Sequence, residues 1–132
     1  MPEKRTMNRA QRARRQGKAP TTQAGEFVLE EIEHMRQGKH GARSTKQAIA
    51  IGLSKARRAG VKLPPPKQGR TSATTRKRAA RDDRRGRAGG RRRPSARRSR
   101  ATLRALQREG RQATSRKALA KQARTAARRR AA

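Results

Sequence analysis

The scarcity of large apolar side chains is the feature that most constrains how this chain folds. Of its 39 apolar residues, 24 are alanine, which leaves 15 large apolar side chains, with one Phe and no Trp or Tyr. Burial of so little apolar surface does not offset the conformational entropy that a fully ordered chain loses. The 40 Lys and Arg residues, against 8 Asp and Glu residues, give a net charge of +32, whose self-repulsion opposes compaction. We therefore expect a small folded segment in a chain that is otherwise disordered or conditionally helical.

Charge and large apolar residues divide the chain into three segments. Residues 1–25 have a net charge of +6 and are predicted to form a basic disordered arm. Residues 26–63 have a net charge of +4 and hold ten of the 15 large apolar side chains, so the folded segment is placed there. Residues 64–132 have a net charge of +22 and begin with three prolines, which cannot continue a helix. This last segment is predicted to be a basic tail.

The first half of the folded segment has the pattern of an amphipathic helix. Val28, Ile32 and Met35 are spaced so that they share one helix face. The glutamates at its start are expected near the positive end of the helix dipole, and Gly38 is the expected C-terminal stop. The glutamates Glu26, Glu30, Glu31 and Glu33 are the chain's only acidic cluster. They either restrain the basic arms intramolecularly, which we prefer, or mark a partner site.

A second helix is predicted to follow, which makes the fold class all-α with a small helical hairpin at its centre. Ser44 and Gln47 fit a capping box at its start, and Gly60 is the expected stop. Two helices alone are marginally stable at this size. We therefore expect Val61 and Leu63 to fold back over the hairpin, or two copies of the chain to form a homodimer through it.

The tail holds two weaker helix signatures. One lies near residues 99–109 with Ser99 as its expected cap, and the other lies near residues 115–130 and begins at Thr114 or Ser115. Repulsion between like charges one turn apart should keep both helices only partly formed until a polyanion binds. Residues 80–98 are broken by glycine and proline and are predicted to be a linker, in which Asp82 and Asp83 reduce the local charge.

Residues 38–66, GKHGARSTKQAIAIGLSKARRAGVKLPPP, contain the most specific motif of the chain. Lys46 to Ile51, Leu53, Ser54, Ala56 and Arg57 resemble the KQAIAI-x-LS-x-AR helix of a poorly characterised family of bacterial basic proteins with Arg-, Lys- and Ala-rich extensions. Residues 98–130 are similar to those extensions and, more loosely, to the tails of linker-histone-like bacterial proteins. This resemblance implies association with DNA or the nucleoid.

The charge by itself predicts a polyanionic partner, and we expect sequence-independent binding and neutralisation of duplex DNA. Each phosphate that a cation neutralises releases condensed counterions, whatever the base sequence. Arginine outnumbers lysine in the tail and makes bidentate phosphate contacts. The expected contacts come from the second helix and the tail: Lys46, Lys55, Arg57, Arg58, Arg91, Arg92, Arg93, Arg97, Arg98, Arg100, Arg128, Arg129 and Arg130.

Two other nucleic-acid functions remain open at this stage. An RNA- or ribosome-associated protein has the same composition, because charge does not distinguish RNA from DNA. A sequence-specific reader of the helix-turn-helix type would place the second predicted helix in the major groove. No apolar run approaches the ~18 residues of a membrane span. We therefore expect a cytoplasmic, nucleoid-bound protein with no membrane partner.

No enzymatic site, metal site or cofactor is predicted. The chain has no cysteine and two histidines. Glu30 and His34 are one helical turn apart, but neither this pair nor His40 has a further ligand at a spacing typical of zinc sites. Ser54 has no acid or base nearby in sequence that would activate it as a nucleophile. We therefore expect a protein that is not an enzyme.

Overall fold

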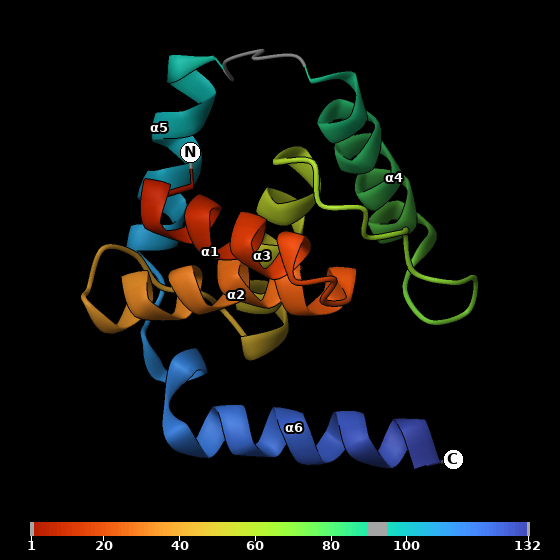
Figure 1. Ribbon diagram of the computed structural model, residues 1–132. Helices are drawn as coiled ribbons and strands as arrows, with labels where there is room; N and C mark the ends of the chain where they lie inside the picture. The colour runs from red at the N-terminus through yellow and green to blue at the C-terminus, as the bar shows by residue number, and fades with distance from the viewer. Residues whose placement is uncertain (1, 90–94, 132) are drawn as a thin grey trace. The chain divides into compact units, whose positions relative to one another are not determined.

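The computed structural model describes residues 2–89 and 95–131, and this part of the chain is helical without β-strands (Figure 1). The elements in chain order are α1 (Lys4–Arg15), α2 (Pro20–Arg36), α3 (Thr45–Arg58), α4 (Ala73–Ala88), α5 (Ala96–Gln107), the short 3₁₀ helix η1 (Gln112–Thr114) and α6 (Arg116–Ala131). The predicted all-α class is therefore confirmed. The prediction of a lone hairpin between disordered arms is wrong, because helices also form before and after it.

Helix α1 lies in the segment that was predicted to be a disordered arm. Its buried residues are Thr6, Ala10 and Ala13, spaced so that they share one face. These side chains are small, so a search for large apolar residues does not detect this face. Small side chains nevertheless allow the helix to approach its neighbours closely. The scarcity of large apolar residues therefore limits the size of the core without preventing helix packing.

Helix α4 lies mostly in the segment that was predicted to be a linker. Ser72 caps it by accepting a hydrogen bond from the Thr75 amide at 3.2 Å. Its buried residues are Ala79, Asp82 and Asp83. The linker prediction was wrong for residues 80–88, because this segment is helical and Asp82 contacts α3, which holds the helix in place.

The two helices predicted in the tail are present with small changes at their starts. Helix α5 begins at Ala96, because Ser95 accepts a hydrogen bond from the Arg98 amide at 3.3 Å. Ser99 lies inside this helix and is not its cap. Helix α6 is capped by Ser115, which accepts from the Ala118 amide at 3.1 Å, as predicted.

The chain divides into two compact units that are not contiguous in sequence, unlike the three segments expected from composition. Unit 1 comprises Met1–Glu30 and Ile51–Arg92, and unit 2 comprises Glu31–Ala50 and Arg93–Ala132. Each unit has its own cluster of buried apolar side chains. Helices α2 and α3 each contribute residues to both units.

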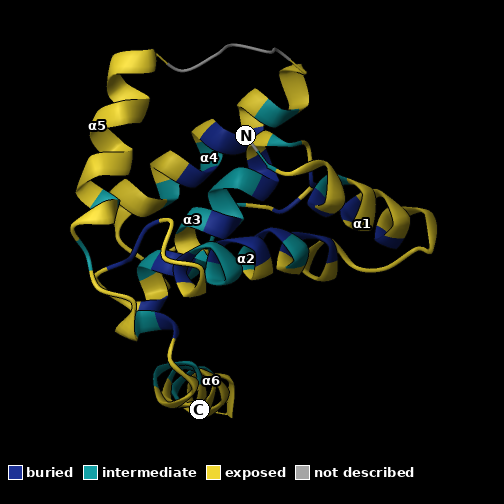
Figure 2. Cartoon of the chain, turned by 90° about the vertical axis from the view of Figure 1, so that its left-hand side faces the viewer, coloured by how far each residue is buried: buried dark blue, intermediate teal, exposed yellow. Residues whose placement is uncertain are grey.

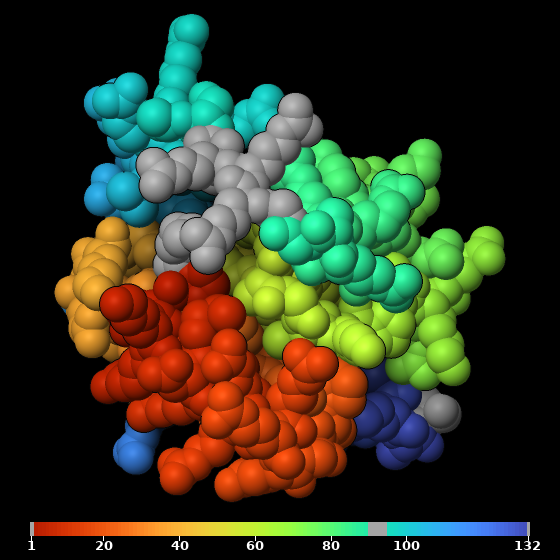
Figure 3. Space-filling view, turned by 45° about the horizontal axis from the view of Figure 1, so that its top comes forward, coloured from red at the N-terminus to blue at the C-terminus, as the bar shows by residue number. Residues whose placement is uncertain are grey.

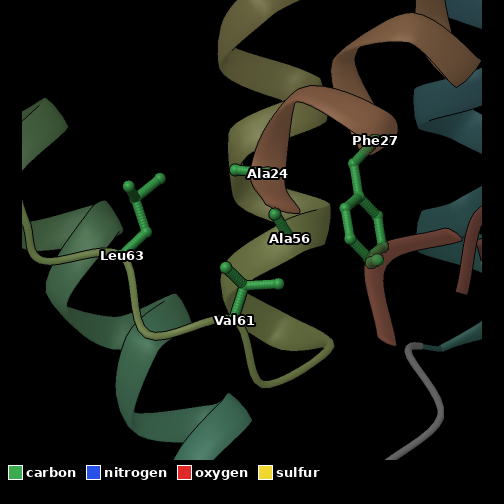
Figure 4. Packing of buried hydrophobic residues seen from close by; sticks show 6 residues of the cluster. Ala24, Phe27, Ala56, Val61 and Leu63 are labelled. Carbon is green, nitrogen blue, oxygen red and sulfur yellow. The ribbon is translucent and has the colours of Figure 1, made fainter. Parts of the chain in front are cut away.

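The core of unit 1 is built around Phe27, which has no exposed surface. It forms one cluster with the buried residues Ala10, Ala24, Ala56, Val61 and Leu63, most of which are shown in Figure 4. The prediction that Val61 and Leu63 fold back over the hairpin is therefore confirmed. The alanines extend this cluster from α1 to α3, so one large aromatic side chain serves three helices.

The acidic residues of α2 hold α1 within unit 1. The Glu30 carboxylate accepts a hydrogen bond from the Glu3 amide at 2.6 Å, and Glu26 lies 3.8 Å from the Arg9 guanidinium. Glu26 and Glu30 thus have the intramolecular role that we preferred, whereas Glu31 contacts His34 and His40. Their predicted place at the start of the helix is wrong, because α2 already begins at Pro20. Proline is well suited to a first helical turn, where its missing amide is not needed.

Unit 2 is built around the end of α2 and the loop that follows it. Met35, which has no exposed surface, clusters with Ala42 and Ala48. Gly38 has a φ of +78° and ends α2, as predicted. The loop is fixed to the end of α5, because the Gly41 amide donates to the Leu106 carbonyl at 2.8 Å.

The start of α3 has the predicted serine cap. The Ser44 hydroxyl accepts a hydrogen bond from the Gln47 amide at 3.1 Å. The Gln47 side chain reaches back as expected, although it accepts from the amide of Arg43, at 2.7 Å, rather than from that of Ser44. At the other end of α3, the Gly60 amide donates to the Arg57 carbonyl and Gly60 follows the last turn, as predicted.

Candidate functional site

In unit 1, α4 is attached to α3 through Asp82. The Ser54 hydroxyl donates a hydrogen bond to Asp82 Oδ2 at 2.7 Å, and Arg58 Nε lies 3.8 Å from Asp82 Oδ1. Asp83 pairs with Arg87 of the same helix at 3.0 Å. Both aspartates are buried. The two acidic residues of α4 therefore make their contacts with other residues of unit 1.

The two helices approach each other most closely at Gly86. A Cβ atom at this position would overlap the carbonyl oxygen of Arg57. A glycine inside a helix normally weakens it by about 1 kcal/mol relative to alanine. Here the missing side chain is what allows the backbone of α4 to lie against the end of α3.

Arg57 belongs to this helix contact rather than to the surface. Its side chain is buried and donates to the carbonyls of Leu63 at 3.2 Å and Pro64 at 3.1 Å. Burial lowers the pKa of Arg57 below its usual value, while the carboxylates of Asp82 and Asp83 oppose that shift. Arg57 fixes the segment after α3 and is not placed to contact a phosphate. We therefore correct the prediction that it binds nucleic acid.

The outward side of α4 carries a group of exposed cations. Lys77, Arg81 and Arg84 share one helix face, and Arg78 and Arg85 flank it. All five side chains are exposed, and none is paired with a carboxylate from the part of the chain that the structure describes. We call these five residues the α4 basic face. The space-filling view shows side chains of α4 (green) projecting from the surface (Figure 3).

In unit 2, helix α6 also separates its charges from its less exposed side chains. Lys117, Lys121, Arg124 and Arg128 are exposed and fall on one face, which we call the α6 basic stripe. Ala118, Leu119, Gln122, Thr125 and Ala126 are half-buried on the other side. The helix contains no acidic residue. With a rise of about 1.5 Å per residue, the stripe presents a cation every ~5 to 6 Å.

Helix α5 carries a smaller basic surface in the same unit. Arg97, Arg100 and Arg104 are exposed on one side. Leu103, 45% exposed, lies on another side, and no residue of α5 is buried (Figure 2). At the start of α6, a cavity of about 390 Å³ is lined by Arg36, Arg111, Thr114, Ser115 and Arg116. Three guanidinium groups beside a helix start form an environment that favours an anion.

The predicted contact residues are placed unequally. Lys46 and Arg58 are exposed on α3, whereas Lys55 is half-buried there. The predicted residues of α5 and α6, namely Arg97, Arg98, Arg100, Arg128, Arg129 and Arg130, are all exposed. Arg91, Arg92 and Arg93 lie outside the described residues. Sequence reasoning missed the α4 basic face, although the spacing of Lys77, Arg81 and Arg84 was the signal that would have revealed it.

Helix α3 offers little surface with which to read bases. Most of its residues are buried or half-buried (Figure 2). A Cβ atom at Gly52 would lie 2.6 Å from Val28 Cα, so α2 covers one side at close range, and α4 covers another through Ser54. A base-reading role would therefore depend on the exposed residues Lys46 and Arg58.

A second group of polar side chains lies in unit 2, where sequence reasoning expected no site. Glu31 and His34 are on the last turns of α2, and His40 is in the loop after it. Glu31 Oε2 is 3.0 Å from His40 Nε2, and Glu31 Oε1 is 3.8 Å from His34 Nδ1. The sequence pointed to the pair of Glu30 and His34, but the burial of Glu31 beside His40 depends on the path of the loop.

The contact between α3 and α4 leads to a first expected result. The substitution Ser54→Ala should lower the free energy of unfolding by about 1.5 kcal/mol, because it removes a hydrogen bond to the buried Asp82 carboxylate. Urea unfolding followed by circular dichroism measures this change. The substitution Ser99→Ala, at an exposed helical position, is the control and should have almost no effect. Equal effects of the two substitutions would contradict the assigned contact.

Within the described residues, no helix is both long enough and apolar enough to cross a membrane.

Comparison with known proteins adds one result, which is a match to a protein family. No curated protein and no solved structure matches the chain. The comparisons give no support for a similarity to linker-histone-like proteins. A family model matches residues 3–68, which is half of the chain and includes α1, α2, α3 and the KQAIAI motif. The chain therefore belongs to DUF6496, a family of unknown function.

Proposed function

We propose that this protein binds duplex DNA without sequence preference and neutralises its backbone. The observation that supports this most strongly is the separation of charge in α4. Asp82 and Asp83 are buried within unit 1, and the five cations of the α4 basic face are exposed. Burial of the two aspartates keeps their negative charge away from the α4 basic face, whose positive charge they would otherwise partly neutralise.

Physically, such a surface binds phosphates through counterion release. Each cation that replaces condensed counterions contributes about 0.9 to the salt slope of the binding constant on duplex DNA. The five residues of the α4 basic face correspond to a slope of about −4.5. The seven exposed cations of the α6 basic stripe and of α5 (Arg97, Arg100 and Arg104) raise the limit to roughly −11 if every cation is engaged.

The single aromatic residue favours a duplex over a single strand. Single-strand binders stack bases on exposed aromatic rings. Phe27 is the only Phe, Tyr or Trp of the chain, and its side chain is fully buried in unit 1. Base stacking on this ring is therefore not available to the folded protein. Arginine side chains suit contacts with a double-stranded backbone, in which the phosphates are regularly spaced.

The proposed function requires no catalysis, and we propose that the protein is not an enzyme. Ser54 is the serine nearest to an acidic side chain, and its hydroxyl donates to Asp82 as part of the contact between α3 and α4. This serine has a structural partner rather than a base that would activate it. A protein of the proposed kind is expected to be located on the nucleoid.

Binding to several nucleic acids at different salt concentrations tests the proposal. Two duplex DNAs of unrelated sequence should bind with nearly equal affinity, and the log–log salt slope should be steeper than about −4. Fluorescence anisotropy with the full chain measures both quantities. An RNA duplex and a single-stranded DNA provide the comparison, and both should bind more weakly. A slope shallower than −2, tighter binding to RNA, or a thousandfold preference for one DNA sequence would contradict the proposal.

A further inference from the structure

The group of Glu31, His34 and His40 in unit 2 has the chemistry of a metal site. One ligand atom from each residue, a carboxylate oxygen or an imidazole nitrogen, lies within 4.8 Å of the other two. Glu31 is 1% exposed, and the His40 and His34 side chains are 8% and 15% exposed. Two histidines and one glutamate are a ligand set that proteins use for Zn²⁺ with water as the fourth ligand.

The separations fit a small tetrahedral cation. Zn–N and Zn–O bonds of 2.0–2.1 Å place two ligand atoms about 3.4 Å apart when the geometry is tetrahedral. Glu31 Oε2 lies 3.0 Å from His40 Nε2 and Glu31 Oε1 lies 3.8 Å from His34 Nδ1, so each imidazole faces a carboxylate oxygen at a distance near this value. The two imidazole rings are nearly perpendicular, at 81°, and are not stacked. The three ligand atoms already lie within 4.8 Å of one another, so binding of one ion requires the group to contract without a rearrangement of the fold.

The contacts of His40 direct its Nε2 toward the Glu31 carboxylate. Its Nδ1 lies 3.1 Å from the Gly41 carbonyl oxygen, and its Nε2 faces the Glu31 carboxylate at 3.0 Å. A neutral imidazole donates from only one nitrogen, so it cannot satisfy both oxygens. When Nδ1–H donates to the Gly41 carbonyl, the lone pair of Nε2 faces the carboxylate, where both can be ligands of one cation. A histidine that donates Nδ1–H to a backbone carbonyl while Nε2 binds metal is a common arrangement in metalloproteins.

The surrounding backbone holds the three residues in place without the ion. Glu31 and His34 are one turn apart on α2, so their side chains share a face. His40 is held by its neighbours in the loop: the Gly41 amide donates to the Leu106 carbonyl at 2.8 Å, and the Ala42 amide donates to the Gly110 carbonyl at 3.2 Å. The ligands are therefore preorganised by contacts within unit 2.

We propose that Glu31, His34 and His40 form a site for a divalent transition metal ion of the Zn²⁺ class, which joins the end of α2 to the following loop. His40 binds through Nε2, His34 through Nδ1 and Glu31 through a carboxylate oxygen. The site is independent of the proposed DNA binding, because it uses none of the residues of the basic surfaces. The net charge of +32 repels cations elsewhere on the chain, so uptake of metal requires a specific site.

Titration of the full chain with Zn²⁺ tests this proposal. One equivalent should bind, and in ¹⁵N-labelled protein only the stated nitrogens of the two histidines should shift as ligands. Because these are the only histidines of the chain, assignment is direct. Zn²⁺ should also raise the melting temperature. No binding of Zn²⁺, or a shift of only one histidine, would overturn the proposal.

Variants distinguish Zn²⁺ binding at this site from weak Zn²⁺ binding at other carboxylates. Each of His34→Gln, His40→Gln and Glu31→Gln should weaken Zn²⁺ binding by more than about 100-fold, since ligand loss costs more than loss of a residue that only supports a ligand. Glu33→Gln makes the same change on α2 outside the group and should bind like the original chain. Circular dichroism verifies that the variants remain helical. Retention of binding in the His34→Gln/His40→Gln double variant would overturn the proposal, whether or not Glu31→Gln folds.

Discussion

Replacement of the α4 basic face by glutamine is expected to reduce duplex affinity by about 10⁴- to 10⁵-fold at 0.1 M salt, because each lost phosphate contact removes about 0.9 log unit at this concentration relative to 1 M salt. The variant is K77Q/R78Q/R81Q/R84Q/R85Q, whose five positions are exposed. Its salt slope should be shallower than that of the original chain by about 4.5. Fluorescence anisotropy at several salt concentrations measures both effects.

A variant with the same charge but different positions distinguishes the α4 basic face from net charge. The control is R12Q/R14Q/R15Q/K18Q/R70Q, which removes five exposed cations from other parts of unit 1. We expect its affinity for the duplex to fall less than about tenfold, because these five residues act on DNA only through the long-range electrostatic field. Similar losses in the two variants would show that binding depends on total charge and not on the face that α4 presents.

The substitution Gly86→Ala is expected to destabilise unit 1 by roughly 3 kcal/mol, the upper part of the range for extra volume forced into a packed interior. Helix propensity alone predicts the opposite sign, a gain of about 1 kcal/mol. The close approach to the Arg57 carbonyl decides the result, because the new Cβ would overlap this oxygen. Helix α4 must then move away from α3, which weakens the contact between Ser54 and Asp82.

Gly25→Ala is the matched control for this result. Gly25 also lies inside a helix of unit 1, but a Cβ atom there has no neighbour within 4 Å. This substitution should stabilise the protein by up to about 1 kcal/mol. Chemical unfolding of both variants, followed by circular dichroism, gives the two free energies. Stabilisation by Gly86→Ala would show that α4 is not attached to α3 in solution.

The parts of the fold that local sequence signals determine could be predicted. Ser44 and Ser115 cap helices because a hydroxyl next to free amides stabilises the first turn in any context. Gly38 ends α2 because its backbone adopts a positive φ without strain. These signals act within a few residues, so they do not depend on the rest of the structure.

The parts that depend on contacts between distant residues could not be predicted. The buried face of α1 consists of Thr6, Ala10 and Ala13, which have ordinary helical spacing but bury little surface until another helix covers them. Asp82 is equally ambiguous, because only its contact with Ser54 distinguishes a buried aspartate from a solvated one. For the same reason the sequence indicated a basic surface but did not locate it on α4.

The metal-site residues show the same limit at shorter range. The sequence pointed to Glu30 with His34, one helical turn apart, and did not single out Glu31. The position of His40 depends on the loop after Gly38 and on its hydrogen bonds to the end of α5. Sequence spacing therefore did not reveal the arrangement of Glu31, His34 and His40.

Because the chain has two compact units, the proposed function would use two binding surfaces per chain. Unit 1 presents the α4 basic face, and unit 2 presents the α6 basic stripe, so one chain carries two separate binding surfaces. When one surface is bound, the other is held at a high effective concentration near the same polyanion, and avidity of this kind strengthens binding by about 10²- to 10⁴-fold when both surfaces can engage. A second duplex is an alternative partner for the free surface. On the proposed function, we expect one chain to occupy a single duplex at low DNA concentration and to crosslink duplexes into a network when DNA is crowded.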